Sequence, residues 1–198
     1  MPPSPELSKK MAEVFISLTS DLKNESDRGC VILGIAWIED QLTELLVGYC
    51  LHPEGGKKQG DEVFGVSGAV GTFSAKIDLA YRLGLIRRQV KLSLHLCRRV
   101  RNDFAHRSSH LSFQTASVRD RVLEMFRLNE AVLGNIWILV KHNWAYQGLP
   151  IAPEDRGAIH ALESTLGTRE LFQWTVGLIV IGLIRAAGEV ERIQPLSE

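Results

Sequence analysis

The sequence predicts an all-α protein that folds as a single-domain antiparallel helical bundle. Apolar residues recur at steps of three and four along most of the chain, and no stretch shows the strict alternation typical of a half-buried strand. Glycine and proline gather between the periodic segments. The chain has 198 residues, of which 45% are hydrophobic, so it is long enough to bury one sizeable core. We expect one domain over residues 1–198, with its core in 5–147 and 168–192 and a surface connection at 148–167.

Two helices are expected before the first glycine-rich loop. Ser4 followed by Pro5 is typical of a helix start, and this helix is predicted to end near Asn24. The chain restarts at residues 25–27 with a long central helix. Its core face is predicted to consist of Val31, Ile35, Ile38, Leu42, Leu45, Leu46 and Tyr49.

The loop at 52–71 contains six glycines but lacks the Gly-Lys-Ser/Thr ending of a phosphate-binding loop. We interpret these glycines as turn and close-packing residues. A weaker alternative is an anion held at the helix start near Thr72.

A shorter helix follows the loop and ends at Gly84. Its inward residues are predicted to be Phe73, Ile77, Ala80 and Tyr81. Lys76, Asp78 and Arg82 are predicted to face solvent. The next helix is expected over 87–106.

The second half of the chain continues the helical period. Ser117 is a predicted N-cap, and the pattern after it reaches Trp144, either as one helix or as two with a kink near Gly134. Thr168 is predicted to cap the last helix, which is apolar on nearly all sides over 171–184. Such a helix lies at the centre of a core or in an oligomer interface.

Charge is balanced overall and unbalanced locally. Basic and acidic residues number 23 each, which argues against a protein that binds nucleic acid through its whole surface. Between residues 87 and 110, however, seven basic residues face one acidic residue, an excess of six positive charges. We expect an anionic partner or nucleic acid to bind here. The candidate binding residues are Arg87, Arg88, Lys91, Arg98 and Arg99.

The cellular compartment is predicted to be the cytoplasm. Cys30, Cys50 and Cys97 are odd in number and lie in apolar helical patterns, as buried free thiols in a reducing environment do. The N-terminus lacks the pattern of a secretion signal. The most apolar run, 174–184, has eleven residues, fewer than the ~20 that span a bilayer. We therefore expect no contact with a membrane.

The stretch around Arg101 carries the candidate chemistry. Arg101 falls on the apolar stripe of its predicted helix, where a charged side chain needs a counter-charge or several acceptors. Glu39 and Asp40 are the possible partners, although a solvated edge explains them equally well. A guanidinium at Arg101, a carboxamide at Asn102 and an imidazole at His106 could together position a phosphate and move a proton.

The alternative is a structural role, in which Arg101 forms hydrogen bonds within the protein and the His106 imidazole caps the C-terminal end of the helix. His106 and His110 have metal-ligand spacing, but the serines between them end the helix and no third ligand is visible. No metal and no cofactor are predicted.

Three blocks of this sequence resemble the mannitol operon repressor family. They are residues 34–42, GIAWIEDQL, residues 71–86, GTFSAKIDLAYRLGLI, and residues 100–106, VRNDFAH. The likeness is close over roughly residues 30 to 110 and looser in the C-terminal helix. The last block also resembles the Arg-x4–6-His signature of HEPN domains, which are small, all-helical and often dimeric.

The resemblance implies two different functions. One is a transcriptional regulator that acts through an unknown protein partner, because no DNA-reading helix-turn-helix is evident. The other is a metal-independent, toxin-like endoribonuclease of the HEPN type. In that case Arg101 would stabilise charge on the phosphate and His106 would act as general acid or base. A homodimer is expected for either, from the likeness and from the apolar last helix.

Overall fold

The computed structural model of the protein describes residues 3–51, 62–106, 111–128 and 156–196. These residues form α-helices and contain no strand, which confirms the all-α class. The helices are α1 (Pro5–Lys23), α2 (Asp27–Tyr49), α3 (Phe73–Arg82), α4 (Arg88–His106), α5 (Ala116–Arg127) and α7 (Arg156–Glu189). The predicted helix beyond residue 128, with the alternative kink at Gly134, lies outside the described residues, as does His110.

Side-chain caps begin the first three helices where the sequence predicts them. The hydroxyls of Ser4, Ser26 and Thr72 each accept a hydrogen bond from the amide three residues further along, at 3.2, 3.0 and 3.2 Å. The prediction for α5 is wrong by two residues. Thr115, not Ser117, stands before its first residue, and the Thr115 hydroxyl accepts from the amide of Ser112 instead of a helix amide.

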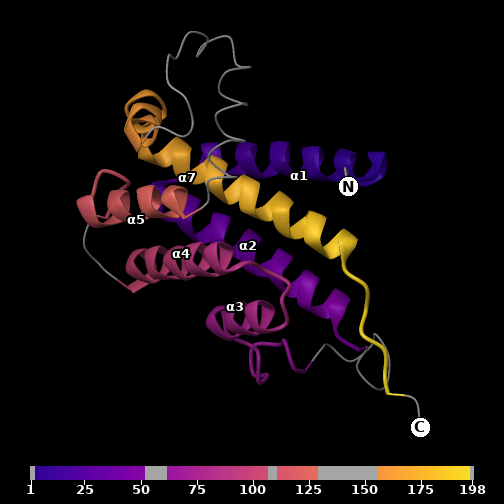
Figure 1. The fold of residues 1–198 in the computed structure, drawn as a ribbon. Helices are drawn as coiled ribbons and strands as arrows, with labels where there is room; N and C mark the ends of the chain where they lie inside the picture. The colour runs from indigo at the N-terminus through magenta and orange to yellow at the C-terminus, as the bar shows by residue number, and fades with distance from the viewer. Residues whose placement is uncertain (1–2, 52–61, 107–110, 129–155, 197–198) are drawn as a thin grey trace.

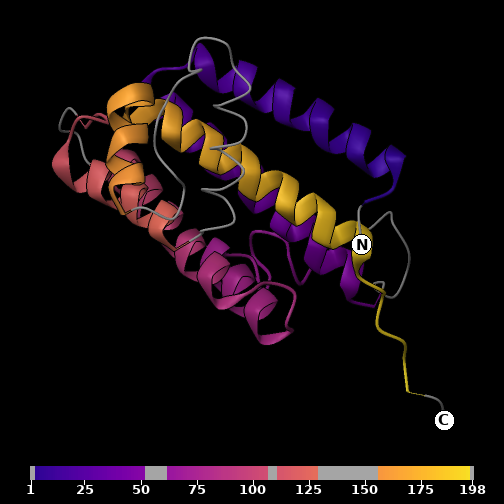
Figure 2. The same ribbon diagram turned by 45° about the horizontal axis from the view of Figure 1, so that its top comes forward.

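The core lies around α2 and the second part of α7, with α1 on one side and α3, α4 and α5 on the other (Figures 1 and 2). The predicted face of α2 is buried except for Tyr49, which is partly exposed. Most of the described apolar residues in the second part of α7 are buried, and they include Leu171, Phe172, Val176, Val180 and Leu183. Burial in the core therefore accounts for the apolar character of this helix without an oligomer interface.

Helices α2 and α7 run in the same direction, so the bundle is not antiparallel throughout. At the start of α2 and in the middle of α7, Arg169 Nη1 donates to Asp27 Oδ1 at 2.8 Å. At the end of α2 and beyond the end of α7, the amide of Ile193 donates to the carbonyl of Tyr49 at 2.9 Å. Short loops make consecutive helices antiparallel, but α2 and α7 are far apart in the sequence and are not bound by that rule.

A break at Gly167 divides α7 into two segments. Gly167 has φ 78° and ψ 154°, a conformation that favours glycine, and Figure 1 shows the chain turning before the long second segment. The prediction of a surface connection up to residue 167 is thus wrong from Arg156 onward. Leu162 and Leu166 are buried there, and that burial stabilises a helix despite the flanking glycines.

Helix α1 lies along the second segment of α7 and is held by close packing. A Cβ built at Gly177 would lie only 2.6 Å from Phe15 Cε2, so the two helices approach closely at this point. The Phe15 ring also meets Trp174 edge to face, with centroids 6.4 Å apart. A side chain at position 177 would therefore require the Phe15 ring to move.

Within the described residues, Leu162–Glu189 is long and apolar enough to cross a membrane by length and composition. Of its most apolar window, 56% is buried against the rest of the chain. A core helix of a soluble protein has the same character, so this observation is weak support for a membrane span.

Two of the three thiols are buried. Cys30 and Cys97 are enclosed and Cys50 is only partly buried, so the prediction of three buried thiols is wrong for Cys50. Burial raises the pKa of Cys30 to about 11 and that of Cys97 to about 12. We expect both enclosed thiols to be unreactive.

Candidate functional site

The carboxylate of Glu39 joins three helices. Its Oε2 atom accepts a hydrogen bond from Arg101 Nη1 of α4 at 3.0 Å, and its Oε1 atom accepts one from Lys76 Nζ of α3 at 3.3 Å. Glu39 itself belongs to α2. Asp40, the other predicted partner of Arg101, is exposed and forms no ion pair in the described part of the chain. We call Glu39, Lys76 and Arg101 the charge triad.

The buried cation of the charge triad is Lys76, not Arg101. The side chain of Lys76 is 9% exposed and that of Glu39 18%, whereas that of Arg101 is 38% exposed. The predictions of Arg101 in the core and Lys76 in solvent are therefore both wrong. Arg101 lies at the edge of the apolar stripe, from which its long side chain reaches outward. Lys76 is enclosed because α3 packs against both α2 and α4.

The described structure does not bring Arg101, Asn102 and His106 to one point. Asn102 and His106 are exposed, and no hydrogen bond connects them with Arg101 among the described residues. At about 100° per residue, His106 lies ~140° around the helix axis from Arg101. A substrate phosphate would need to bridge two sides of α4 to meet both groups.

The end of α4 is capped by a residue that the sequence did not indicate. Arg28 Nε, from the first turn of α2, donates to the carbonyl of Phe104 at 2.7 Å. A guanidinium at a helix C-terminus satisfies free carbonyls and complements the helix dipole. The capping role considered for His106 is thus filled at this carbonyl by Arg28.

The cations that are predicted to bind an anion differ in their exposure and in their contacts. Arg87, Arg88 and Arg99 are exposed. Lys91 Nζ binds Asp78 Oδ1 of α3 at 2.8 Å, and the hydrogen bond from Lys91 is the main cause that lowers the pKa of Asp78. Arg98 is half-buried, and its enclosed Nε atom has no hydrogen-bond partner in the described structure.

The prediction that Tyr81 faces the core is also wrong. Tyr81 is exposed instead of inward, and its ring lies beneath Lys91, with Nζ 4.8 Å from the ring centroid. The sequence placed this residue on the apolar face by spacing alone. The aromatic ring instead contacts the ammonium group of a lysine on the neighbouring helix.

Two other charge clusters hold helices together and were also missed by the sequence reasoning. Arg169 bonds Asp27 and, through Nη2, the carbonyl of Leu22 at 3.1 Å, so it fixes the turn between α1 and α2. Glu163 in α7 pairs with Arg119 in α5, and this hydrogen bond is the main cause that lowers the pKa of Glu163. Both clusters join residues far apart in the sequence, which spacing cannot reveal.

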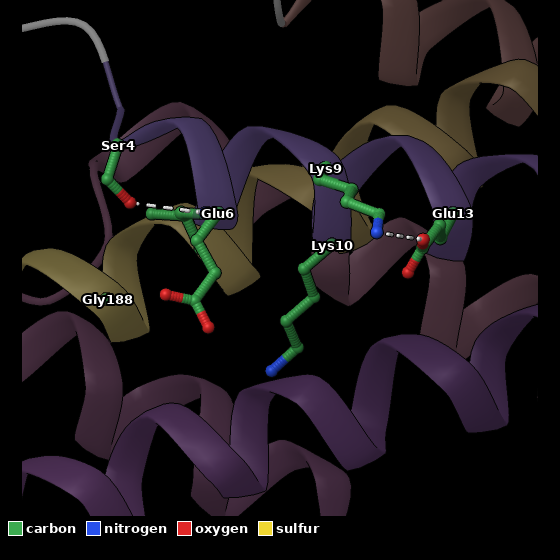
Figure 3. A pocket seen from close by; sticks show the side chains of 7 residues that line it. Ser4, Glu6, Lys9, Lys10, Glu13 and Gly188 are labelled. Carbon is green, nitrogen blue, oxygen red and sulfur yellow. Dashed lines mark hydrogen bonds and ion pairs between the residues drawn. The ribbon is translucent and has the colours of Figure 1, made fainter.

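A hollow lies between the start of α1 and the end of α7 (Figure 3). Its charged residues are exposed, and Lys9 and Glu13 form an ion pair of 3.8 Å at its edge. Residues Ser4, Glu6, Leu7, Lys9, Lys10, Glu13 and Gly188 line it. None of these residues places an enclosed polar group in the hollow, so we assign the hollow no function. No cluster of three or more metal-ligating side chains occurs in the residues that the structure describes.

Comparison with known proteins does not place this chain in a family. The chain matches no protein-family model, no curated protein and no solved structure. The likeness to mannitol operon repressors therefore rests on the three sequence blocks, and the function has to be inferred from the side chains described above.

Proposed function

We propose that this chain is a helical, cytoplasmic regulatory protein of the mannitol operon repressor type. It would control transcription of a sugar-uptake operon through a protein partner, without reading DNA itself. One observation carries the proposal. Each of the three sequence blocks that resemble the repressor family contributes one member of the charge triad: Glu39 from the first, Lys76 from the second and Arg101 from the third.

The charge triad supports a structural role for Arg101. A catalytic arginine must direct its guanidinium at the charge that develops in the transition state. Here one arm of the guanidinium is bound to a carboxylate that also neutralises the enclosed Lys76 ammonium. The contacts tie α2, α3 and α4 together, so they contribute to the fold whether or not a ligand is present.

The proposal extends to the arrangement of the helices. We propose a HEPN-like domain in which α2, α3 and α4 supply the shared frame, and α7 is the parallel exception to an otherwise antiparallel bundle. The sequence blocks that carry the likeness fall on these three helices and on the turns beside them. The balanced overall charge supports a protein partner over direct DNA binding.

A homodimer remains part of the proposal. Its support is the likeness to HEPN domains alone, because most of the described apolar residues of α7 are buried within the chain. Light scattering at micromolar concentration should give about twice the chain mass of 22.1 kDa. A particle of the chain mass itself would rule the dimer out under those conditions.

Transcription of the sugar-uptake operon in the organism that encodes the chain tests the regulatory proposal. Deleting the gene should raise transcript levels, and supplying the wild-type chain should restore repression. Purified chain should cause no sequence-specific shift of the operon promoter. Unchanged transcript levels on deletion, or a specific shift by the chain alone, would contradict the proposal.

A metal-independent ribonuclease is the second candidate, and a specific observation favours it. Arg101 keeps 38% of its side chain exposed, and the adjacent Asn102 and His106 on the following turn are exposed as well. An RNA bound along α4 could use the exposed Arg87, Arg88 and Arg99 for its phosphates. His106 would then act on the 2′-hydroxyl, which restricts such a reaction to RNA.

A further inference from the structure

The break at Gly167 joins two segments of α7 that pack against different helices. In the first segment, the Glu163 carboxylate binds Arg119 of α5. In the second segment, Gln173 Nε2 donates to the carbonyl of Leu22 of α1 at 3.0 Å. The second segment also lies along α2 in both views (Figures 1 and 2). The bend therefore lets one helix reach two separate sites.

The backbone conformation of Gly167, and not a lack of space, requires glycine at this position. Its φ of 78° and ψ of 154° fall in a region that is essentially restricted to glycine. A Cβ atom built there would meet nothing within 4 Å. The Thr168 hydroxyl donates to Glu163 Oε1 at 3.1 Å across the break. Residues five apart on a continuous helix lie ~140° apart around its axis, so this contact belongs to the bent form.

A continuous α7 is favoured by its backbone and opposed by its packing within one chain. Helical angles at Gly167 would merge the two segments into one helix over Arg156–Glu189. A single copy could not then keep both sets of contacts, and the buried Leu162 and Leu166 would be exposed. Two copies remove this conflict. Because the chains are identical, the second segment of one copy fits the α1 and α2 surfaces of the other with the same contacts.

We propose that Gly167 is the hinge of an exchanged dimer with a second copy of this chain. In this dimer α7 is continuous, its first segment stays on α5 of its own copy, and its second segment packs against α1 and α2 of the other copy. The bond between Arg169 and Asp27 and the contact between Trp174 and Phe15 then join the two copies. The exchange differs from a homodimer of two closed chains and does not depend on the regulatory function.

Gly167→Ala tests the hinge, by light scattering after the protein is unfolded and refolded at micromolar concentration. Alanine destabilises the bent conformation and favours the continuous helix, and both effects act in both copies. The association constant of the dimer should therefore rise on the order of 1,000-fold. Gly182→Ala adds the same methyl group within the second segment, where nothing lies within 4 Å, and is the matched control. Its association constant should change less than about twofold.

Subunit mixing separates an exchanged dimer from a dimer of closed chains. Two differently tagged preparations of Gly167→Ala should form mixed dimers only when they are refolded together, because separating the copies opens the core. A dimer of closed chains mixes in native buffer after dilution. Rapid native mixing of the Gly167→Ala dimer would overturn the exchange while leaving the homodimer proposed above intact.

Spin labels measure the shape of α7 in the dimer. They are placed at His160→Cys and Gly182→Cys in a Cys50→Ser background, and labelled chains are diluted with unlabelled ones to isolate the distance within one chain. A continuous helix separates these positions by about 33 Å, at 1.5 Å per residue. The closed chain should give a shorter distance, because α7 bends between the labels. A dimer that keeps the shorter distance would contradict the proposal.

Thr168→Val is a second route to the same result if Gly167→Ala fails to refold. Valine keeps the shape of threonine but removes the bond to Glu163 that spans the bend. Losing a hydrogen bond to a charged group in the bent form should raise the association constant about tenfold or more. If every folded variant shows the same dimer fraction as Gly182→Ala, Gly167 is not a hinge for exchange.

Discussion

Glu39→Gln is the substitution that should destabilise the charge triad most, because it removes the one carboxylate that two cations share. The lysine ammonium is left in a site where only 9% of its side chain is exposed. Breaking a well-buried pair by removing one partner costs about 3–5 kcal/mol, and an exposed pair is worth about 0–1 kcal/mol. Glutamine keeps the shape and one acceptor oxygen, so we expect a loss of about 2–3 kcal/mol.

Variants of the two cations and of Asp40 should each lose less stability than Glu39→Gln. Arg101→Gln should lose about 1 kcal/mol or less, because that side chain is 38% exposed. Lys76→Met should lie within about 1 kcal/mol of the wild type, since an apolar chain fills the buried stem and Glu39 keeps Arg101. Asp40→Asn changes the same charge at the adjacent exposed position and should be neutral.

Urea unfolding at pH 7 measures these differences directly, and thermal melts check them. For a chain of this length, 2–3 kcal/mol corresponds to a fall in melting temperature of about 4–12 °C. If Glu39→Gln costs no more than Asp40→Asn, the enclosed ammonium is not held by this carboxylate. If Arg101→Gln costs as much as Glu39→Gln, the burial assigned to Lys76 is wrong.

Three further predictions concern the rest of the fold. Gly177→Ala should lose about 1–3 kcal/mol in urea unfolding by overpacking against α1, while Gly182→Ala on the same helix, with nothing within 4 Å of its added methyl group, should be neutral or stabilising. A thiol reagent should modify one cysteine of the native protein, and Cys50→Ser should abolish that reaction, because the two enclosed thiols have raised pKa values. The pKa of Glu163 lies below its usual 4.5, chiefly because Arg119 donates a hydrogen bond to its carboxylate. The ionised carboxylate therefore stabilises the fold above pH 4.5, and this stabilisation is lost as pH falls through the lowered pKa. Urea unfolding midpoints measured from about pH 6 to 3 should fall less steeply in Glu163→Gln than in the wild type. A parallel fall in wild type and variant would show that this carboxylate does not drive acid unfolding.

Local signals in the sequence were sufficient for the helix class and for most helix starts. Ser4, Ser26 and Thr72 bond to amides three residues along, and such a contact depends only on the neighbouring sequence. The same signals failed at 156–166. There the glycines suggested a connection, while Leu162 and Leu166 are buried against distant helices. Tertiary burial outweighed local preference in that segment.

The site could be anticipated only in part, for a related reason. A guanidinium on an apolar stripe indicated that Arg101 needs a carboxylate, and Glu39 was one of two candidates. The sequence predicts Lys76 in solvent, because it falls on the polar side of a short helix. Only the packing of α3 against both α2 and α4 makes it the enclosed cation. The capping of α4 by Arg28 likewise joins positions 76 residues apart, beyond the reach of any spacing rule.

The most direct test of a structural role for Arg101 is an RNA cleavage assay in EDTA across pH 5 to 8, a range that covers the titration of an ordinary histidine. Wild type, Arg101→Ala and His106→Ala should be prepared in parallel, with their folding checked by thermal melts. We predict no cleavage above background by any of the three, and a small loss of stability in Arg101→Ala. Cleavage by the wild type that falls by a factor of ~100 or more in both folded variants would contradict a structural role for Arg101 and establish the ribonuclease instead.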